Sequence, residues 1–215
     1  TMETQLVTTV TIKKLNDATG EVIETIDNHE FQVENTGFSM ARHYVVAGKP
    51  YVFLLKRNAG PFRKNRPRIY RLRSNGALGE LVNPLQTHLP PVDLGSGWTE
   101  ADFLALGNKT YLVLHNARTG RISLYQTLPD SRLLLIYSDE VNDFKDKDKF
   151  SLYRYRGKSY FFGLNTELGE AVFYAVNGGK IGSQTLTPGW TSVDHLTVNG
   201  NTYRLLYKAT HHPFQ

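Results

Sequence analysis

Cysteine is absent from the 215 residues of this chain. Disulfides, thiolate metal ligands and a cysteine nucleophile are therefore excluded, and stability must come from packing alone. No apolar run approaches the roughly 18 to 20 residues that a membrane-spanning helix needs, so no membrane span is expected. The start, TMETQLVTTV, also lacks the basic and apolar regions of a signal peptide. Thr1 precedes Met2, which leaves room for a removed leader; the compartment stays open, with secretion slightly favoured.

The overall composition is that of a globular protein rich in strands. Apolar residues make up 40% and charged residues 21% of the chain, which is ordinary globular usage. The 12 tyrosines and 11 phenylalanines favour strands over helices. The net charge of +5 indicates mild attraction to anionic partners. A single all-β domain over residues 1–215 is the expectation for a chain of this length.

One segment of the sequence is repeated. GWTEADFLALGNKTYLVLHNARTG, from Gly97, aligns without a gap with GWTSVDHLTVNGNTYRLLYKAT, from Gly189. The identical pairs include Trp98 and Trp190, Thr99 and Thr191, Asp102 and Asp194, and Tyr111 and Tyr203. A weaker copy from Gly37 puts Phe38 at the tryptophan position, and a fourth copy puts Lys147 there. Repeats of this kind predict one structural unit used several times.

Each copy reads as two strands joined by a Gly or Asn turn, and two further strands follow it. Four strands per unit of about 40 to 60 residues is typical of a propeller blade. The last unit stops two strands short, whereas the strands VTTVTIKKL and GEVIETI at the start have no opening pair. We therefore predict a four-bladed β-propeller with four antiparallel strands per blade, its last blade closed by the N-terminal strands. The expected blades are about 37–90, 95–140, 145–187, and 189–215 completed by 5–28.

The blade count resembles that of the hemopexin-like propeller, and the Gly-Trp-Thr opening resembles the repeats of bacterial propeller lectins. The disulfide that usually joins the first and last hemopexin-like blades has no counterpart in this chain. The resemblance to lectins implies aromatic rings that stack on the apolar faces of sugars while neighbouring polar groups hold the hydroxyls. A glycan or glycoprotein would then be the partner.

Seven residues of the repeat are candidates for ligand binding. They are Phe38, Trp98, Asp102, Tyr111, Trp190, Asp194 and Tyr203. The alternative for the rings is packing between blades. The two aspartates could line a central channel and bind an ion or a polar ligand, or act as an acid/base pair in hydrolysis. Alternatively, the two aspartates are solvated or hydrogen-bonded within turns. No cofactor is expected beyond this possible channel ion.

Two charged segments stand out. Residues 56–73 carry eight Lys or Arg in 18 positions and no acid. An anion-binding arm of Arg57, Arg63, Lys64, Arg66 and Arg68 is one interpretation, and a solvated loop is the other. Residues 140–150 hold three aspartates beside three lysines, but they lack the Gly and closing Glu of an EF-hand, so a charged connector is expected.

The sequence contains no nucleophile elbow, phosphate-cradling glycine loop or metal-ligand spacing. The leading hypothesis is accordingly a non-catalytic, lectin-like repeat protein that binds carbohydrate through repeated aromatic sites. The second is a protein-interaction or targeting scaffold that docks an anionic protein or polyanion through residues 56–73. A small hydrolase with channel carboxylates is the third hypothesis. Because it ranks last, the chain is not expected to be an enzyme.

Overall fold

The computed structural model of the chain is built of strands throughout. The residues it describes are 6–15, 21–33, 38, 40–55, 68–82, 97–106, 108–130, 132–176, 178–198 and 201–208. They form sixteen strands and one short 3-10 helix. Within this part of the chain there is no helix with the length and apolar character needed to span a bilayer. The prediction of an all-β chain is confirmed.

Residue contacts divide the chain into two compact units, which are described separately. Unit 1 comprises Thr1–Trp98, Ala105–Thr110 and Gln126–Leu134, and unit 2 comprises Thr99–Leu104, Tyr111–Tyr125 and Leu135–Gln215. The sheet of β7 (Glu100–Leu106), β8 (Lys109–Asn116), β9 (Arg121–Thr127) and β10 (Leu133–Glu140), in the order β10-β9-β8-β7, contributes segments to both units.

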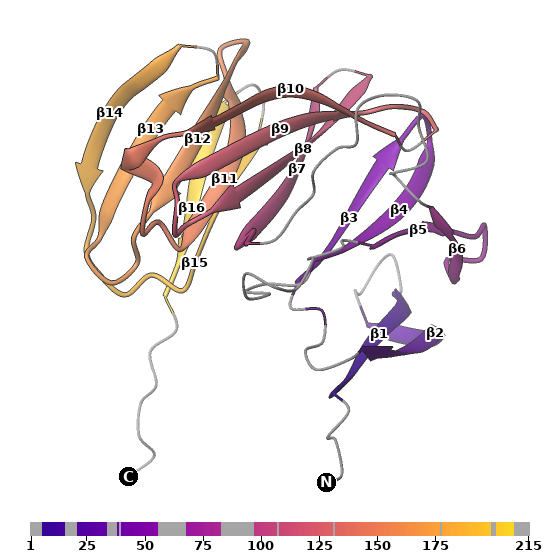
Figure 1. Ribbon diagram of the computed structural model, residues 1–215. Helices are drawn as coiled ribbons and strands as arrows, with labels where there is room; N and C mark the ends of the chain where they lie inside the picture. Colours follow the sequence, from indigo (N-terminus) through magenta and orange to yellow (C-terminus); the bar gives the residue numbers. More distant parts are fainter. Residues whose placement is uncertain are drawn as a thin grey trace, which may run out of the picture. The chain divides into compact units, whose positions relative to one another are not determined.

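Unit 1 contains an antiparallel hairpin and a four-stranded sheet (Figure 1). The hairpin is formed by β1 (Leu6–Leu15) and β2 (Val22–Val33), and the sheet by β3 (Met40–Val46), β4 (Lys49–Leu55), β5 (Arg68–Leu72) and β6 (Leu78–Val82). Ala47 and Gly48, both with positive φ, join β3 to β4 in the two-residue turn typical of hairpins. Val52, Leu54 and Leu78 form the core of the sheet.

Unit 2 contains a second antiparallel sheet and hairpin. The sheet consists of β11 (Lys149–Tyr155), β12 (Lys158–Leu164), β13 (Glu170–Ala175) and β14 (Gly179–Thr185), and it follows the 3-10 helix η1 (Asn142–Phe144). The hairpin consists of β15 (Ser192–Val198) and β16 (Asn201–Tyr207). Three four-stranded sheets of the described residues fall within 37–90, 95–140 and 145–187, so the prediction of four antiparallel strands per blade is confirmed.

The strands predicted at the two ends of the chain are present as two hairpins. Thr9 pairs with Glu30 in the hairpin of β1 and β2, and Leu205 pairs with Asp194 in the hairpin of β15 and β16. The first hairpin belongs to unit 1 and the second to unit 2. Closure of the last blade by the N-terminal strands would join the two units, and it stays a prediction.

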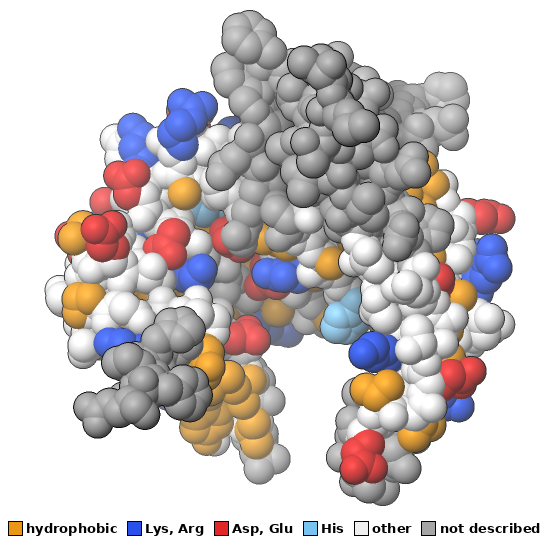
Figure 2. Space-filling view, turned by 90° about the horizontal axis from the view of Figure 1, so that it is seen from below, with side chains coloured by type: hydrophobic (Ala, Val, Ile, Leu, Met, Phe, Trp, Pro, Cys, Tyr) orange, Lys and Arg blue, Asp and Glu red, His pale blue; other side chains and the backbone are white. Residues whose placement is uncertain are grey.

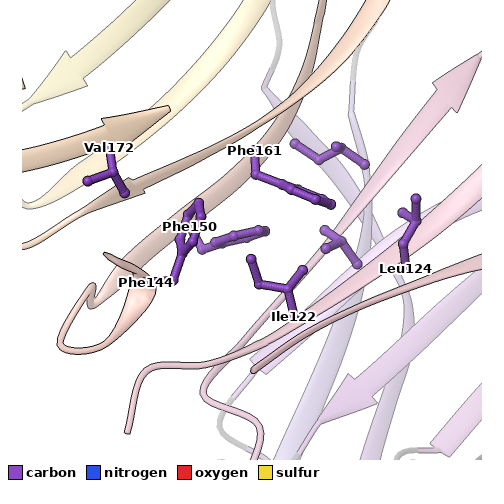
Figure 3. Close-up of a cluster of buried hydrophobic side chains, with 8 residues drawn as sticks. Ile122, Leu124, Phe144, Phe150, Phe161 and Val172 are labelled. Atoms are coloured by element: carbon purple, nitrogen blue, oxygen red, sulfur yellow. The ribbon is translucent and has the colours of Figure 1, made fainter. Parts of the chain in front are cut away.

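An aromatic core, built of three phenylalanine rings among aliphatic side chains, lies in unit 2 (Figure 3). Phe144, Phe150 and Phe161 gather there with Ile122, Leu124 and Val172, which project from β9 and β13. The ring centroids of Phe144 and Phe150 are 5.5 Å apart, and those of Phe150 and Phe161 are 5.6 Å apart. These separations are typical of favourable tilted and edge-to-face pairs.

A glycine between β12 and β13 tests how closely the chain is packed in unit 2. Gly169 has φ +74°, and a Cβ there would lie 2.0 Å from the carbonyl oxygen of Leu186, so the backbone would have to move. Gly157 has φ +80° and nothing within 4 Å of its Cβ position. Gly157→Ala is expected to lower the free energy of unfolding by about 1 kcal/mol, because its cost is conformational alone. Gly169→Ala is expected to lower it by about 2 kcal/mol more. Urea unfolding of both variants measures this difference, and equal losses would contradict the packing described.

Candidate functional site

A polar cleft of about 1200 Å³ lies within unit 2. Its walls come from η1 and the connector that follows it, from the turn between β12 and β13, and from β13 and β14. Asp143, Lys147, Glu170 and Lys180 supply charge, while the lining also includes hydroxyl and amide side chains. Acidic and basic side chains are interspersed over the strands of unit 2 in Figure 2. The cleft therefore offers several hydrogen-bonding groups of both kinds to a polar ligand.

Asp143 is held in the cleft by two donors that share one of its oxygens. The Tyr174 hydroxyl donates to Oδ2 at 2.5 Å, and Lys180 Nζ lies 2.9 Å from the same atom. The hydrogen bonds from Tyr174 and Lys180 lower the pKa of Asp143, so its carboxylate is ionised at neutral pH. Burial, with the hydrogen bond to Asp143, raises the pKa of Tyr174 to about 12. Oδ1 has no donor among the described residues and is available to a ligand.

The position of Asp143 follows from its neighbour in η1. Phe144 is fully buried in the aromatic core, and its amide donates to Val141 O at 2.9 Å. Lys145 N donates to Asn142 O at 3.0 Å, which completes the turn. Because the turn is anchored by a buried ring, the carboxylate beside it is fixed at the wall of the cleft.

Lys147 brings a nearly buried positive charge to the same cleft. Only 8% of its side chain is exposed, and Nζ lies 3.2 Å from Oε2 of Glu170, whose side chain is 58% exposed. The lysine stem passes close to Gly163, where a Cβ would lie 3.2 Å from Lys147 Cγ. Lys147 is the residue that replaces the aromatic ring of the repeat, so the aliphatic stem takes a packing position while the ammonium group reaches the cleft.

The other acids of the 140–150 connector have structural roles. Asp148 accepts hydrogen bonds from the amide and the hydroxyl of Thr166, both at 2.7 Å, and so fixes the turn between β12 and β13. Asp146 adopts φ +59° and its amide donates to Ala117 O at 2.7 Å. In the described part of the chain, no three His, Asp or Glu side chains are grouped so as to hold a metal ion. Both oxygens of Asp148 are thus in use, whereas Asp143 and Asp146 each keep an oxygen without a donor among the described residues. Asp143 differs from Asp146 in being held by two side-chain donors, Tyr174 and Lys180.

A second polar cluster of unit 2 is centred on His195. Its Nδ1 lies 2.9 Å from Ser151 Oγ, and Arg204 Nε donates to its Nε2 at 3.1 Å. An arginine nitrogen only donates, so Nε2 is the acceptor and the neutral ring carries its proton on Nδ1, toward Ser151. Burial and the charge of Arg204 lower the pKa of His195 to about 4. The histidine donates to the serine instead of removing its proton, so the pair is not an activated nucleophile.

The structure places the repeat tryptophans in packing positions. Trp98 is 2% exposed, so neither face of its ring is available to a sugar. Trp190 is half-buried and packs against a cluster that contains Phe162 and Leu164. Tyr111 packs against the aromatic core of unit 2. The burial of Trp98 favours the alternative of packing, because a large buried ring contributes strongly to folding. Sugar stacking on the repeat rings stays a prediction.

The remaining candidates are dispersed. Phe38 is half-buried beneath the guanidinium of Arg68, whose Cζ lies 5.3 Å from the ring centroid. Tyr203 is 51% exposed on β16. Asp102 and Asp194 each use Oδ1 to accept the amide hydrogen of the next residue, at 2.9 and 2.7 Å, so the repeat preserves a local backbone contact.

The basic segment predicted as an anion-binding arm is only partly described. Arg57, Arg63, Lys64 and Arg66 lie outside the described residues. Arg68 is the first residue of β5 and contacts Phe38, so it belongs to the sheet. The anion-binding arm stays a prediction.

Sequence reasoning missed most of the cleft. Lys147, Glu170, Tyr174 and Lys180 come from a connector and two strands, and no short motif contains them. The two signals in the sequence were the acidic connector with Asp143 and the lysine at the aromatic position of the repeat. Both signals pointed to the connector of residues 140–150, but neither indicated the strands that line the cleft with it.

No family model matches the sequence, and no curated protein matches it. Several solved structures are similar in fold. The chain is similar to the GH32 β-fructofuranosidase of Bombyx mori, with a TM-score of 0.56 and 12% identity over 85% of this chain and 45% of that one. It is also similar to the GH43_1 enzyme of Xanthomonas citri solved with xylotriose, with a TM-score of 0.56 and 11% identity over 91% and 72% of the two chains.

A putative 6-phosphogluconolactonase of Bacteroides fragilis is similar as well, with a TM-score of 0.54 and 18% identity over 92% and 57% of the two chains. The expectation of a non-catalytic binding module or docking scaffold is contradicted by these similarities, because the matched proteins are enzymes of carbohydrates. The chain has the β-propeller fold found in these enzymes.

Proposed function

We propose that this chain is a carbohydrate-processing enzyme and that the cleft around Asp143 is its substrate site. The observation that carries the proposal is the state of the Asp143 carboxylate. One oxygen is held by Tyr174 and Lys180, the other has no donor among the described residues, and the group is ionised. The similar folds of glycoside hydrolases and of a sugar lactonase support a carbohydrate substrate.

Hydrolysis of a glycosidic bond suits this arrangement. The bond between the anomeric carbon and the leaving oxygen breaks through a transition state with positive charge on the sugar ring. Water supplies a hydroxyl group to the anomeric carbon and a proton to the leaving oxygen. The negative charge of Asp143 stabilises the developing positive charge through Oδ1. Tyr174 and Lys180 already hold the carboxylate in place, so it does not have to reorient during the reaction.

A glycosidase also uses a second carboxyl group, and Glu170 is the candidate in the cleft. Lys147 Nζ contacts its Oε2, which leaves Oε1 without a partner in the described part of the chain. Thr166, Ser183 and Gln184 line the same cleft and provide donors and acceptors for sugar hydroxyls. Oriented carboxylates beside hydroxyl and amide side chains offer the donors and acceptors that binding of a polyol requires.

Replacing Asp143 by asparagine is expected to lower kcat about 100-fold, because the amide keeps the size of the carboxylate but not its charge. Turnover would be measured on a panel of 4-nitrophenyl glycosides and sugar lactones, using the substrate on which the unmodified chain is most active. Asp139→Asn is the matched control, since Asp139 also accepts a tyrosine hydroxyl, from Tyr137 at 3.4 Å, but does not line the cleft.

Unchanged turnover in Asp143→Asn, or an equal loss in Asp139→Asn, would refute the role of Asp143. A chain that hydrolyses no member of the panel would refute the proposed function as a whole. Glu170→Gln adds a further distinction: if Glu170 protonates the leaving group, its loss should matter less for 4-nitrophenyl substrates, whose leaving group needs little protonation.

A further inference from the structure

Arg204, on β16, is a half-buried cation that lies against two neighbouring aromatic rings. Its Cζ lies 4.3 Å from the ring centroid of Phe162 and 4.7 Å from that of Phe173. Such contacts attract the guanidinium through the ring faces and hold its plane in one orientation. The repeat places fully buried Leu112 at the equivalent position of the other copy, so packing alone does not require an arginine here.

The hydrogen bonds of Arg204 leave most of its donors unused. Nε donates to Nε2 of His195, which is neutral and therefore brings no negative charge. The two terminal nitrogens have no hydrogen bond or ion pair with the described residues. Asp194, the neighbouring acid on β15, directs Oδ1 to the backbone amide of His195. Arg204 thus lacks a carboxylate partner within the described part of the chain.

The surroundings of Arg204 are also fixed in advance. His195 is held by Ser151 at 2.9 Å and is stacked on Tyr153, with ring centroids 4.1 Å apart and an angle of 8° between the planes. Placing a cation at a half-buried position without a counter-charge is unfavourable, because desolvation is not repaid by a partner. Partial burial accordingly lowers the pKa of Arg204. An anion that pairs with the terminal nitrogens would remove this cost.

We propose that Arg204 anchors a binding site for the anionic group of a small ligand, a carboxylate or a phosphate. The guanidinium fork matches both groups, since each offers two oxygens in one plane to two parallel N–H donors. The ring contacts with Phe162 and Phe173 and the hydrogen bond to His195 keep the fork oriented before the ligand arrives. The site does not involve the cleft around Asp143, so it stands or fails independently of the proposed hydrolysis.

The test is calorimetric titration of the full chain with inorganic phosphate, glucuronate and glucose 6-phosphate, with glucose as the neutral probe. Binding is expected for at least one anion and not for glucose. Arg204→Lys keeps the charge but removes the fork, and it should weaken anion binding about tenfold. Arg156→Lys is the matched control, because Arg156 also contacts a ring, Tyr155 at 5.2 Å, but is exposed.

A second measurement does not depend on a variant that folds. In the unmodified chain, anion binding should shift the ring ¹H–¹⁵N signals of His195, because its Nε2 accepts the Arg204 hydrogen bond. Phosphate binding without glucuronate binding identifies a phosphate ligand, and the reverse identifies a carboxylate. No binding by any of the three anions, equal binding of glucose, or an equal loss in Arg156→Lys would overturn the proposal.

Discussion

Replacement of Phe150 by alanine is expected to lower the free energy of unfolding by about 4 kcal/mol, because the substitution removes a buried ring and leaves a cavity. Phe150 is 7% exposed and lies at the centre of the aromatic core of unit 2 (Figure 3). Its ring contacts three others, those of His115, Phe144 and Phe161, with centroids 4.8, 5.5 and 5.6 Å away. Collapse around the cavity is limited because all three neighbours are held by their own strands or turns.

Urea unfolding followed by tryptophan fluorescence and circular dichroism would measure this loss. Phe150→Leu retains most of the apolar volume and should cost about 1 to 2 kcal/mol. Leu168→Ala is the control for removing apolar atoms at the surface, since Leu168 is 56% exposed. A cost for Phe150→Ala no greater than that for Leu168→Ala would show that the aromatic cluster does not support unit 2.

Acidification is expected to destabilise the folded chain through His115. This side chain is fully buried, and its Nε2 donates to Phe144 O at 3.0 Å. Nδ1 has no partner among the described residues, so a second proton would have no acceptor there. Burial lowers the pKa of His115 from 6.5 to about 4. The folded chain therefore binds this proton only at a lower pH than the unfolded chain does.

The sign of the effect follows from the proton balance. Between pH 6.5 and 4 the unfolded chain binds a proton at His115 that the folded chain does not, so stability falls by about 1.4 kcal/mol per pH unit as pH decreases. The total loss is about 3 kcal/mol and is complete below pH 4. His195, whose pKa is lowered in the same way, adds to the loss.

His115→Gln isolates the contribution of this histidine. Glutamine can still donate to Phe144 O but does not titrate, so the variant should show a shallower fall in stability between pH 6.5 and 4. His43→Gln, at an exposed position of β3, is the control and should follow the unmodified chain. Chemical unfolding at several pH values gives the comparison, and parallel curves for His115→Gln and the unmodified chain would contradict the assignment.

Much of the fold could be predicted from local patterns. Alternating residues and glycine turns marked the strands, and the repeat grouped them in fours, as in β11, β12, β13 and β14. The pattern also marked Trp98 as a special position without telling whether its ring would be exposed. Burial depends on what packs against a ring, and for Trp98 that is decided in three dimensions.

The candidate sites were predicted far less well. Asp143, Glu170 and Lys180 are separated along the chain and line one cleft only in the folded unit 2. Arg204 differs from its repeat counterpart Leu112, and this difference is visible in the sequence. The difference could be interpreted only from the positions of Phe162 and Phe173, which lie on two other strands.

The all-β class, the strands and their grouping follow from the amino-acid sequence alone, because hydrophobic alternation and turn residues act over short distances. Which aromatic rings are buried and which charged groups face one another became clear only from the folded chain. These features depend on contacts between distant segments, whose geometry no local pattern contains. The polar cleft around Asp143 is such a feature, as is the fork of Arg204, which has no ion pair with the described residues.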